Sequence, residues 1–459
     1  MQQLLDRHFK ISAKGSTIKT EVIGGLTTFA TMAYIIVVNP AILSFAGFPV
    51  EPMTVATILT AVFGCFLMAF YANLPLAVAP YMGENAFIAF GLAAMGVSWQ
   101  QRLGAVFVSG LLFALLAILR IRPWLANSIS FSLKQSFAAG IGLFLTFIGL
   151  YETGIVVSGA HGMKAEALTL ANGFLRNPDV PLKIGNFHDP QVLLSIAGFV
   201  IIAALMQRKI RGAILLGIVV TACIGMLLGM GQPPTRVFEM PFQGAYSLAP
   251  LAFKMDVVGV LKLSFLPILL TLFLMSFLDT LGTLVGVGSV GHMLDEKGNF
   301  PEIEKPMIVD AATCTFSAVI GSSTAGAFIE SAAGIKEGAR TGLAALVVGL
   351  LFAASLFFIP LVEPLQHLRY AYGPALLAVG LLMMAAIGKI DMEDITESVP
   401  AFSTIVVMIF SYNIANGLTA GLILHPLMKL LAGKQASIHP GAYVLAGLCL
   451  IYYIFGLPH

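Results

Sequence analysis

Charged side chains are scarce in this sequence. Of its 459 residues, 10% are Asp, Glu, Lys or Arg, 58% are hydrophobic, and the mean hydropathy is +0.92. A soluble globular protein carries about 25% charged residues, and even a large domain leaves roughly a quarter of its chain surface in water. The composition excludes a soluble fold and predicts an all-α protein that crosses the lipid bilayer many times. A net charge of +2 gives no indication of a nucleic-acid partner.

Cysteine and catalytic motifs are also scarce. The four cysteines, Cys65, Cys223, Cys314 and Cys449, lie in apolar runs without a C-x-x-C spacing, so we expect small buried side chains rather than disulfides or metal ligands. The sequence contains no H-E-x-x-H, G-x-S-x-G or G-x-x-x-x-G-K-[ST] motif. These absences argue against an enzyme and against an ATP-driven pump, and we expect no cofactor and no metal site.

Apolar segments that are long enough to cross a bilayer, or nearly so, recur along the whole chain. The longest polar stretches, 159–190 and 231–257, are expected to be surface loops, and no second soluble domain is expected. The expected segments are 22–46, 54–72, 75–96, 102–121, 135–158, 191–207, 212–230, 258–290, 308–322, 324–335, 341–361, 372–388, 398–412, 415–431 and 440–457.

Lys and Arg residues cluster in the connections that follow every second apolar segment. A basic cluster precedes the first segment, which predicts a cytoplasmic N-terminus without a cleaved signal peptide. The pattern holds for fourteen segments, and 440–457 is left over as either a fifteenth span or part of a C-terminal hairpin. The basic residues concerned are Arg7, Lys10, Lys14, Lys19, Arg120, Arg122, Arg208, Lys209, Arg211, Lys297, Lys305, Lys336, Arg340, Lys389, Lys429 and Lys434.

The third and tenth segments are interrupted by small residues and are expected to be broken half-helices. Residues 79–87 contain Pro and Gly, and residues 321–331 contain Gly, Ser and Thr. Because each half of the chain holds seven segments, the second half must be inverted relative to the first. Broken segments at matching positions of inverted halves are typical of a transporter binding site near the middle of the membrane.

Three carboxylates lie within apolar segments: Asp279, Glu330 and Glu84. A charge at this depth costs several kcal/mol, so such residues usually bind a ligand or relay protons; a structural hydrogen bond to another helix is the alternative. A buried acid tends to keep its proton, which favours proton coupling through Asp279 and Glu330. A sodium site would need several oxygen ligands, and the sequence leaves this open.

Asp279 shares one helical face with Gly282, Thr283 and Gly286, which lie three, four and seven residues further on. This small, polar face would let a ligand approach, although the two glycines also fit G-x-x-x-G helix packing. Other side chains are weaker candidates: Asn85 could hydrogen-bond a ligand, while Phe87 and Phe328 could stack on it or simply pack. His425 is expected to be structural, and the acidic run 391–397 a solvated loop.

Taken in order, these motifs resemble the nucleobase–cation symporter 2 superfamily, in its AzgA-like branch of purine permeases, over nearly the whole chain. The most specific element is Glu330–Gly334 followed by Gly338–Gly342. The other matching stretches are Gly25–Phe29, Val38–Pro40, Asn73–Pro75, Asn85–Phe87, Asp279–Leu284, Asp295–Gly298 and Thr396–Ala401.

The resemblance implies fourteen spans in two inverted repeats of seven, and proton-coupled purine uptake across the plasma membrane (in a bacterium, the inner membrane), often by a homodimer. Core parts 21–122 and 258–361 would move against gate parts 123–257 and 362–459, with 1–20 as a cytoplasmic N-terminus. Asp279 and Glu330 would anchor the base, with Asn85, Ala86 and Phe328 nearby. The full set of substrate-binding candidates is Asp279, Glu330, Asn85, Glu84, Ala86, Phe87, Phe328, Thr283 and Ser331.

Two residues depart from the family pattern, which usually has an apolar residue at the position of Glu84 and a small one at that of Tyr81. Because both lie in the first broken segment, adenine, guanine and hypoxanthine all remain open as the substrate. An anion transporter or channel of the same architecture is an alternative, but acidic site residues would repel an anion. A membrane enzyme is a second alternative, and the missing catalytic motifs argue against it.

Overall fold

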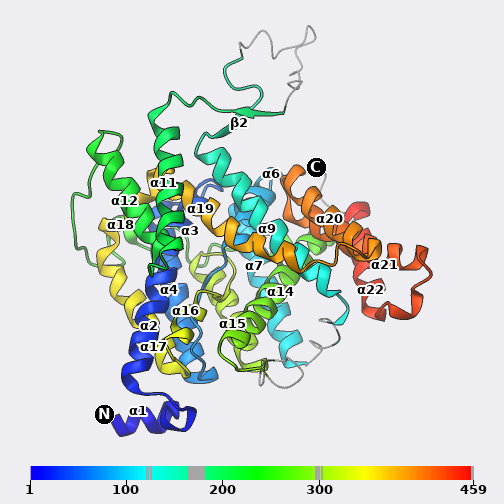
Figure 1. Cartoon of the computed structure of the whole chain (residues 1–459), viewed down its shortest axis with the longest axis horizontal. Coiled ribbons are helices and arrows are strands. Elements are labelled where there is room, and N and C mark those ends of the chain that lie inside the picture. Colours follow the sequence, from blue (N-terminus) through cyan, green and yellow to red (C-terminus); the bar gives the residue numbers. More distant parts are fainter. Residues whose placement is uncertain are drawn as a thin grey trace.

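The protein, seen in a computed structural model, is a bundle of apolar helices (Figure 1). The structure describes residues 2–119, 124, 127–163, 181–294, 300 and 303–455. Within these residues nine helices are long and apolar enough to cross a membrane, which identifies a helical polytopic membrane protein. The nine are Ile18–Ser44, Val50–Ala72, Trp99–Ile118, Phe131–Glu152, Pro190–Gln207, Leu263–Val290, Gly342–His367, Arg369–Lys389 and Ile414–Leu431.

Several helices in the first half of the chain begin at a polar residue whose side chain caps them. The Ser98 side chain accepts a hydrogen bond from Gln101 N–H, and the Gln101 side chain returns one, in a capping box. The elements are α1 (Gln2–Phe9), α2 (Ile18–Met32), α3 (Ile35–Ser44), α4 (Val50–Leu67) with a π turn (Met68–Ala72), β1 (Val78–Pro80), α5 (Met82–Ala86) with a π turn (Phe87–Gly91), α6 (Leu92–Ala94), α7 (Trp99–Ile118), α9 (Phe131–Glu152), β2 (Val156–Ser158), β3 (Leu182–Ile184), α11 (Pro190–Gln207) and α12 (Ala213–Leu227).

The second half contains a similar series. Short 3-10 turns lie at Ser12–Lys14, Gly244–Tyr246, Leu263–Phe265, Leu356–Phe358, Ala385–Lys389 and Gln435–Ser437. The elements are α13 (Val257–Val260), α14 (Leu266–Val290), α15 (Glu304–Ile320), β4 (Ala325–Ala327), α16 (Ser331–Lys336), α17 (Gly342–Ser355), α18 (Ile359–His367), α19 (Arg369–Met384), α20 (Ile395–Phe410), α21 (Ile414–Leu431) and α22 (Pro440–Phe455).

Two details differ from the sequence-based expectation. The first apolar segment is two helices, because α2 ends at Met32 and α3 begins at Ile35. The chain is also not purely helical, since β1 pairs with β4 and β2 pairs with β3 in two short antiparallel ladders. The leftover C-terminal segment is a helix, α22, which packs on α21 and also contacts α14.

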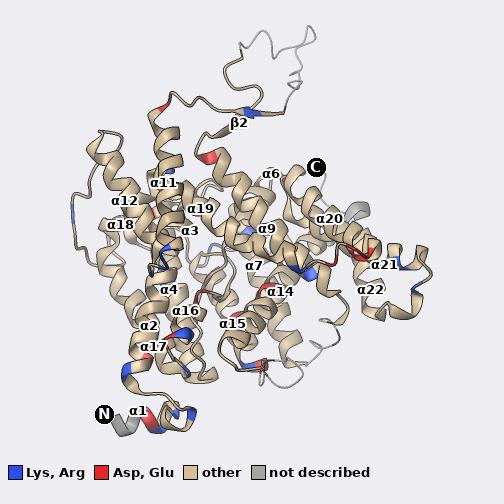
Figure 2. Cartoon of the chain, viewed as in Figure 1, with Lys and Arg blue, Asp and Glu red and all other residues tan. Residues whose placement is uncertain are grey.

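The helices pack in two sets. One set contains α2, α4, α7, α14, α15 and α17, and the other contains α9, α11, α12, α19, α20 and α21. Figure 1 places α1 and the β2 hairpin at opposite ends of the molecule. Most charged residues lie on loops and helix ends, and only a few acidic residues lie within the bundle (Figure 2). Those few are the residues of interest for function.

The two broken segments meet at the centre of the first set of helices, as the antiparallel pair β1–β4. Val78 lies opposite Ala327 and Pro80 opposite Ala325. The pairing continues on both sides, because Tyr81 N–H donates to Thr324 O at 3.0 Å and Phe328 N–H donates to Ala77 O at 2.9 Å. A strand satisfies its backbone groups by pairing, which explains how non-helical chain is tolerated at this depth.

Each strand is also held by a cysteine from a neighbouring helix. The Cys65 thiol donates to Val78 O and its sulfur accepts from Val78 N–H, at 3.4 and 3.3 Å. The Cys314 thiol makes the same pair of contacts with Ala325, at 2.9 and 3.2 Å. Both cysteines are buried, as expected, but each also has this hydrogen-bonding role. The matching contacts relate the first broken segment to the second.

Candidate functional site

Asp279 lies on an open face of α14. Its side chain is partly exposed, and one turn further on Gly282 is exposed, with no atom of another described segment within 4 Å of the place a Cβ would take. At Gly286 the nearest such atom is Ile329 Cδ1, at 3.6 Å. Among the described residues no neighbouring backbone approaches Gly282, which argues against the helix-packing interpretation at this glycine. The small residues instead leave space beside the Asp279 carboxylate.

Glu330 lies between β4 and α16, and it faces the same region as Asp279. Its side chain is partly exposed, and its carboxylate lies within electrostatic range of Asp279. Tyr34, in the break between α2 and α3, donates its hydroxyl to Glu330 Oε1 at 2.8 Å. Tyr34 was missed from the sequence, because its only signal was one phenol in an apolar run. The crossing of the strands thus brings α14 and the second broken segment together.

Glu84 does not share this open face. It is 1% exposed in the first turn of α5, and one carboxylate oxygen, Oε2, accepts a hydrogen bond from Ser276 Oγ at 2.8 Å. Oε1 is buried and has no hydrogen-bond partner in the described residues. Ser276 lies on α14 one turn before Thr280, on a face turned into the protein. Glu84 is therefore buried next to the open face, within electrostatic range of Asp279.

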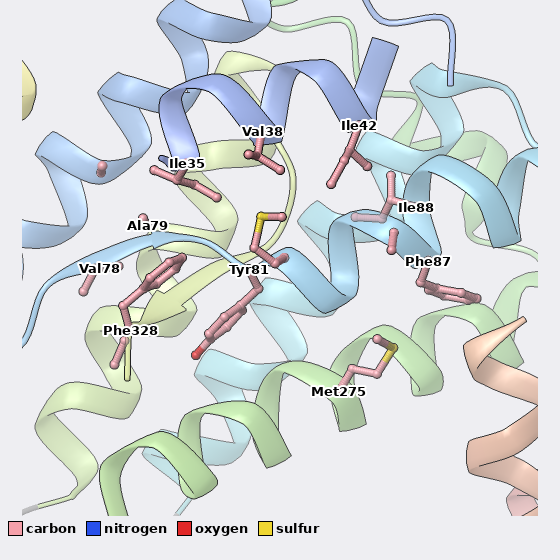
Figure 3. Packing of buried hydrophobic residues seen from close by; sticks show 14 of the residues in the cluster. Ile35, Val38, Ile42, Val78, Ala79, Tyr81, Phe87, Ile88, Met275 and Phe328 are labelled. Atoms are coloured by element: carbon pink, nitrogen blue, oxygen red, sulfur yellow. The ribbon is translucent and has the colours of Figure 1, made fainter. Parts of the chain in front are cut away.

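A fourth buried acid, Asp310 on α15, was missed by sequence reasoning. It is fully buried, and Oδ2 accepts from Thr280 Oγ1 at 2.8 Å, from Ala327 N–H at 3.1 Å and from the Tyr81 hydroxyl at 3.3 Å. Tyr81 points from the end of β1 toward α14, with its ring nearly parallel to that of Phe328 (Figure 3). The available signal was a single carboxylate in the apolar segment 308–322.

Four of the remaining candidates are packed or already hydrogen-bonded. Asn85 donates its amide to Asn39, which in turn donates to Thr57 Oγ1 at 2.7 Å. Ala86 and Phe87 are fully buried. The Ser331 hydroxyl accepts from Ala77 N–H at 3.0 Å, on the flank of the strand pair. The structure therefore gives these four a supporting position next to the crossing.

Phe328 and Thr283 lie closer to the open face. Phe328 is 6% exposed and Thr283 7% exposed. Phe328 precedes Ile329 and Glu330, and its ring centroid lies 6.4 Å from that of Tyr81. In the described residues, no group of three or more His, Cys, Asp or Glu side chains is arranged to hold a metal ion.

A second charged cluster joins α20 and α21, where a solvated loop was expected. Glu397 is mostly buried and lies 2.8 Å from Lys429 Nζ and 3.5 Å from His425 Nε2. The hydrogen bond from Lys434 lowers the pKa of Asp394, which caps α20, below its usual range. Only the start of the acidic run is solvated, because folding of α21 brings its basic residues against the end of the run.

Comparison with known proteins identifies the family. A model described as "Permease family" matches residues 19–419. The chain is 38% identical to the adenine permease AdeP of Escherichia coli, covering 99% of this chain and 97% of that protein. It is 36% identical to the guanine/hypoxanthine permease PbuO of Bacillus subtilis, over 96% of this chain and 99% of that protein.

The fold is also found in solved structures of lower sequence similarity. The transmembrane domain of the cyanobacterial bicarbonate transporter BicA superposes with a TM-score of 0.58 at 18% identity, over 88% of this chain and 97% of that one. At this identity the likeness concerns the fold alone. Together with the full-length relatives, it shows that this chain is a multi-pass membrane transporter of the permease family, in the purine branch of the nucleobase–cation symporter 2 superfamily.

Proposed function

We propose that this protein takes up a purine nucleobase, adenine, guanine or hypoxanthine, together with protons. The observation that carries the proposal is the open face on which Asp279 and Glu330 lie within electrostatic range of each other, beside the exposed Gly282. Among the described residues, no ion pair with Lys or Arg involves either carboxylate. The names of the relatives AdeP and PbuO support a purine as the substrate.

A purine suits this chemistry because it is planar and uncharged, with hydrogen-bond donors and acceptors along its edges. A carboxyl group accepts with its oxygens and, when protonated, also donates. Two carboxyl groups facing the same space can therefore bridge both kinds of edge atom. Protonation removes their mutual repulsion, so binding of the base and binding of the proton favour each other.

The same proposal includes the architecture that the resemblance implies. We infer fourteen spans in two inverted repeats, a cytoplasmic N-terminus, and a core of 21–122 with 258–361 that moves against a gate of 123–257 with 362–459. The two sets of packed helices support this division, and the matching contacts of Cys65 and Cys314 support the repeat. A homodimer in the plasma membrane completes the proposal.

An anion is the alternative cargo, because BicA, which shares the fold, is a bicarbonate transporter. The four acids Glu84, Asp279, Asp310 and Glu330 around the strand crossing oppose it. Each of these acids that is ionised would raise the energy of an anion among the buried side chains, where solvent screening is weak. A neutral base experiences no such penalty.

The test is uptake of labelled adenine, guanine, hypoxanthine and uracil into cells that lack purine transport, with and without a protonophore. We expect uptake of at least one purine, no uptake of uracil, and loss of accumulation when the protonophore is present. A well-expressed chain that accumulates no purine contradicts the proposed substrate. Purine accumulation that ignores the protonophore contradicts the proton coupling alone.

A further inference from the structure

The polar residues of α14 form two separate faces. Asp279, Gly282 and Gly286 lie on the open face, whereas Ser276 and Thr280 are buried and turn toward the strand crossing. Ser276 donates to Glu84 and Thr280 donates to Asp310. Glu84 and Asp310 therefore form a closed acid pair, which is buried next to the open acid pair of Asp279 and Glu330 and lies within electrostatic range of Asp279.

The hydrogen bonds of the closed pair are unequal. Asp310 Oδ2 accepts from Thr280 Oγ1, Ala327 N–H and the Tyr81 hydroxyl, whereas Glu84 Oε2 accepts from Ser276 Oγ alone. Hydrogen bonds donated to a carboxylate stabilise its charged form. Asp310 is therefore the member better suited to carry negative charge, and Glu84 is the member better suited to carry a proton.

The surroundings of Glu84 give the same assignment. The charged groups in electrostatic range are the acids Asp279 and Asp310, and in the described residues no Lys, Arg or His pairs with Glu84. Cys314 and Tyr81 also lie within electrostatic range, and both are neutral donors. An ionised Glu84 would face two like charges in a fully buried position, which is costly.

The second carboxylate oxygen of Glu84 has no donor in the described residues. Oε1 is buried and unpartnered, and the unpartnered hydroxyl of Thr324 lies beside the carboxylate. Asp310 Oδ1 is unpartnered too. The difference between the two acids therefore rests on the donors to Asp310 Oδ2 and Glu84 Oε2 and on their burial.

We propose that Glu84 is a second proton-binding group, which carries one proton per cycle in addition to the proton bound at the open acid pair. Glu84 and Tyr81, the two departures from the family pattern, then serve the same proton site. Tyr81 donates a hydrogen bond to Asp310, the charged partner of Glu84. In each cycle Glu84 takes up a proton from one side of the membrane and releases it to the other, so that two protons accompany each base. This inference rests on the proposed function.

The decisive measurement of protonation uses no substrate. Infrared spectra of the reconstituted full-length protein at neutral pH should contain a carbonyl band of buried, protonated Glu84 beside any band of the open acid pair, and the difference between wild type and Glu84→Gln should show the loss of that one band. Glu239→Gln, which changes a partly exposed acid beside Arg236, is the matched control and should leave this region unchanged. A carbonyl region that Glu84→Gln also leaves unchanged shows that Glu84 is ionised and overturns the proposal. A band that sodium abolishes at constant pH overturns it too, in favour of a sodium site.

The second measurement is the ratio of protons to labelled purine, from reversal potentials in proteoliposomes. We expect two protons per base for the wild type and one for Glu84→Gln, with Tyr81→Phe shifting the pH midpoint of uptake because Asp310 loses one donor. An unchanged ratio in Glu84→Gln overturns the coupling role. If even the wild type moves no purine, the proposed function fails, and the infrared band still decides whether Glu84 binds a proton.

Discussion

The open acid pair and the closed acid pair lie on adjoining faces of the same helix and differ in access. Asp279 and Glu330 are partly exposed beside a glycine with free space around it, and Tyr34 supplies one donor. Glu84 and Asp310 are fully buried, and each accepts a hydrogen bond from a different hydroxyl of α14. A carboxylate in an apolar segment can thus bind a ligand only where small neighbouring residues leave space for that ligand. A carboxylate that is fully buried can only bind or release a proton and accept hydrogen bonds from its neighbours.

Replacing Asp279 by Asn should produce the largest effect. The substitution keeps the shape but removes the carboxyl group, and a hydrogen bond that involves a charged group contributes about 1.5–3 kcal/mol. We expect purine affinity to fall roughly 10- to 100-fold and proton-driven uptake to disappear. The measurement is equilibrium binding and uptake of the labelled base, at equal expression in the membrane. Transport close to wild type would show that Asp279 is structural and would remove the distinction between the two pairs.

Much of the fold could be predicted from the sequence, because hydropathy and Lys/Arg placement report directly on segments that cross a bilayer. The break at Tyr34 was not predictable, since neither Ala33 nor Tyr34 is a Pro or Gly, the residues that usually signal a break. The strand pair was also missed. Pairing of residues 78–80 with 325–327 joins chain positions that only the folded bundle brings together.

The site was predicted in part. Asp279 and Glu330 were identified because each is a charge beside small or broken chain, and the structure brings them to one region. Glu84 was also identified, but its burial could not be inferred. Helical spacing shows which residues of one helix share a face, and it does not show which residues of other helices pack against that face. Asp310 was missed for the same reason. Its partners Thr280, Ala327 and Tyr81 come from three other segments.

A second prediction tests the space on the open side. Gly282→Leu should fold normally, because no atom lies within 4 Å of the added Cβ, but the larger side chain should fill the space beside Asp279. We expect at least about a tenfold loss of purine affinity, the equivalent of 1.4 kcal/mol, with an unchanged melting temperature in detergent.

The matched control is Gly24→Leu, where a Cβ would lie 2.6 Å from Ala339 Cβ and 2.9 Å from Gly334 O. It should lower the melting temperature, because overpacking of a tight contact costs about 1–3 kcal/mol. If Gly282→Leu binds purine as tightly as the wild type, the open face is not where the base lies. The interpretation of α14 as a helix with one ligand face would then be wrong.

The smallest effect is expected from Tyr34→Phe, which removes the one hydroxyl donor to Glu330 and keeps the ring. A hydrogen bond to a charged group contributes about 1.5–3 kcal/mol where the group stays ionised, but a protonated Glu330 needs this donor much less. Because the base and the proton favour each other's binding, a Glu330 that is easier to protonate should bind purine more tightly at alkaline pH, by up to about tenfold, and should bind it unchanged at acidic pH. Binding titrations across pH measure this difference. An effect that is equal at every pH would show that Glu330 does not change its protonation, and proton coupling at the open pair would then rest on Asp279 alone.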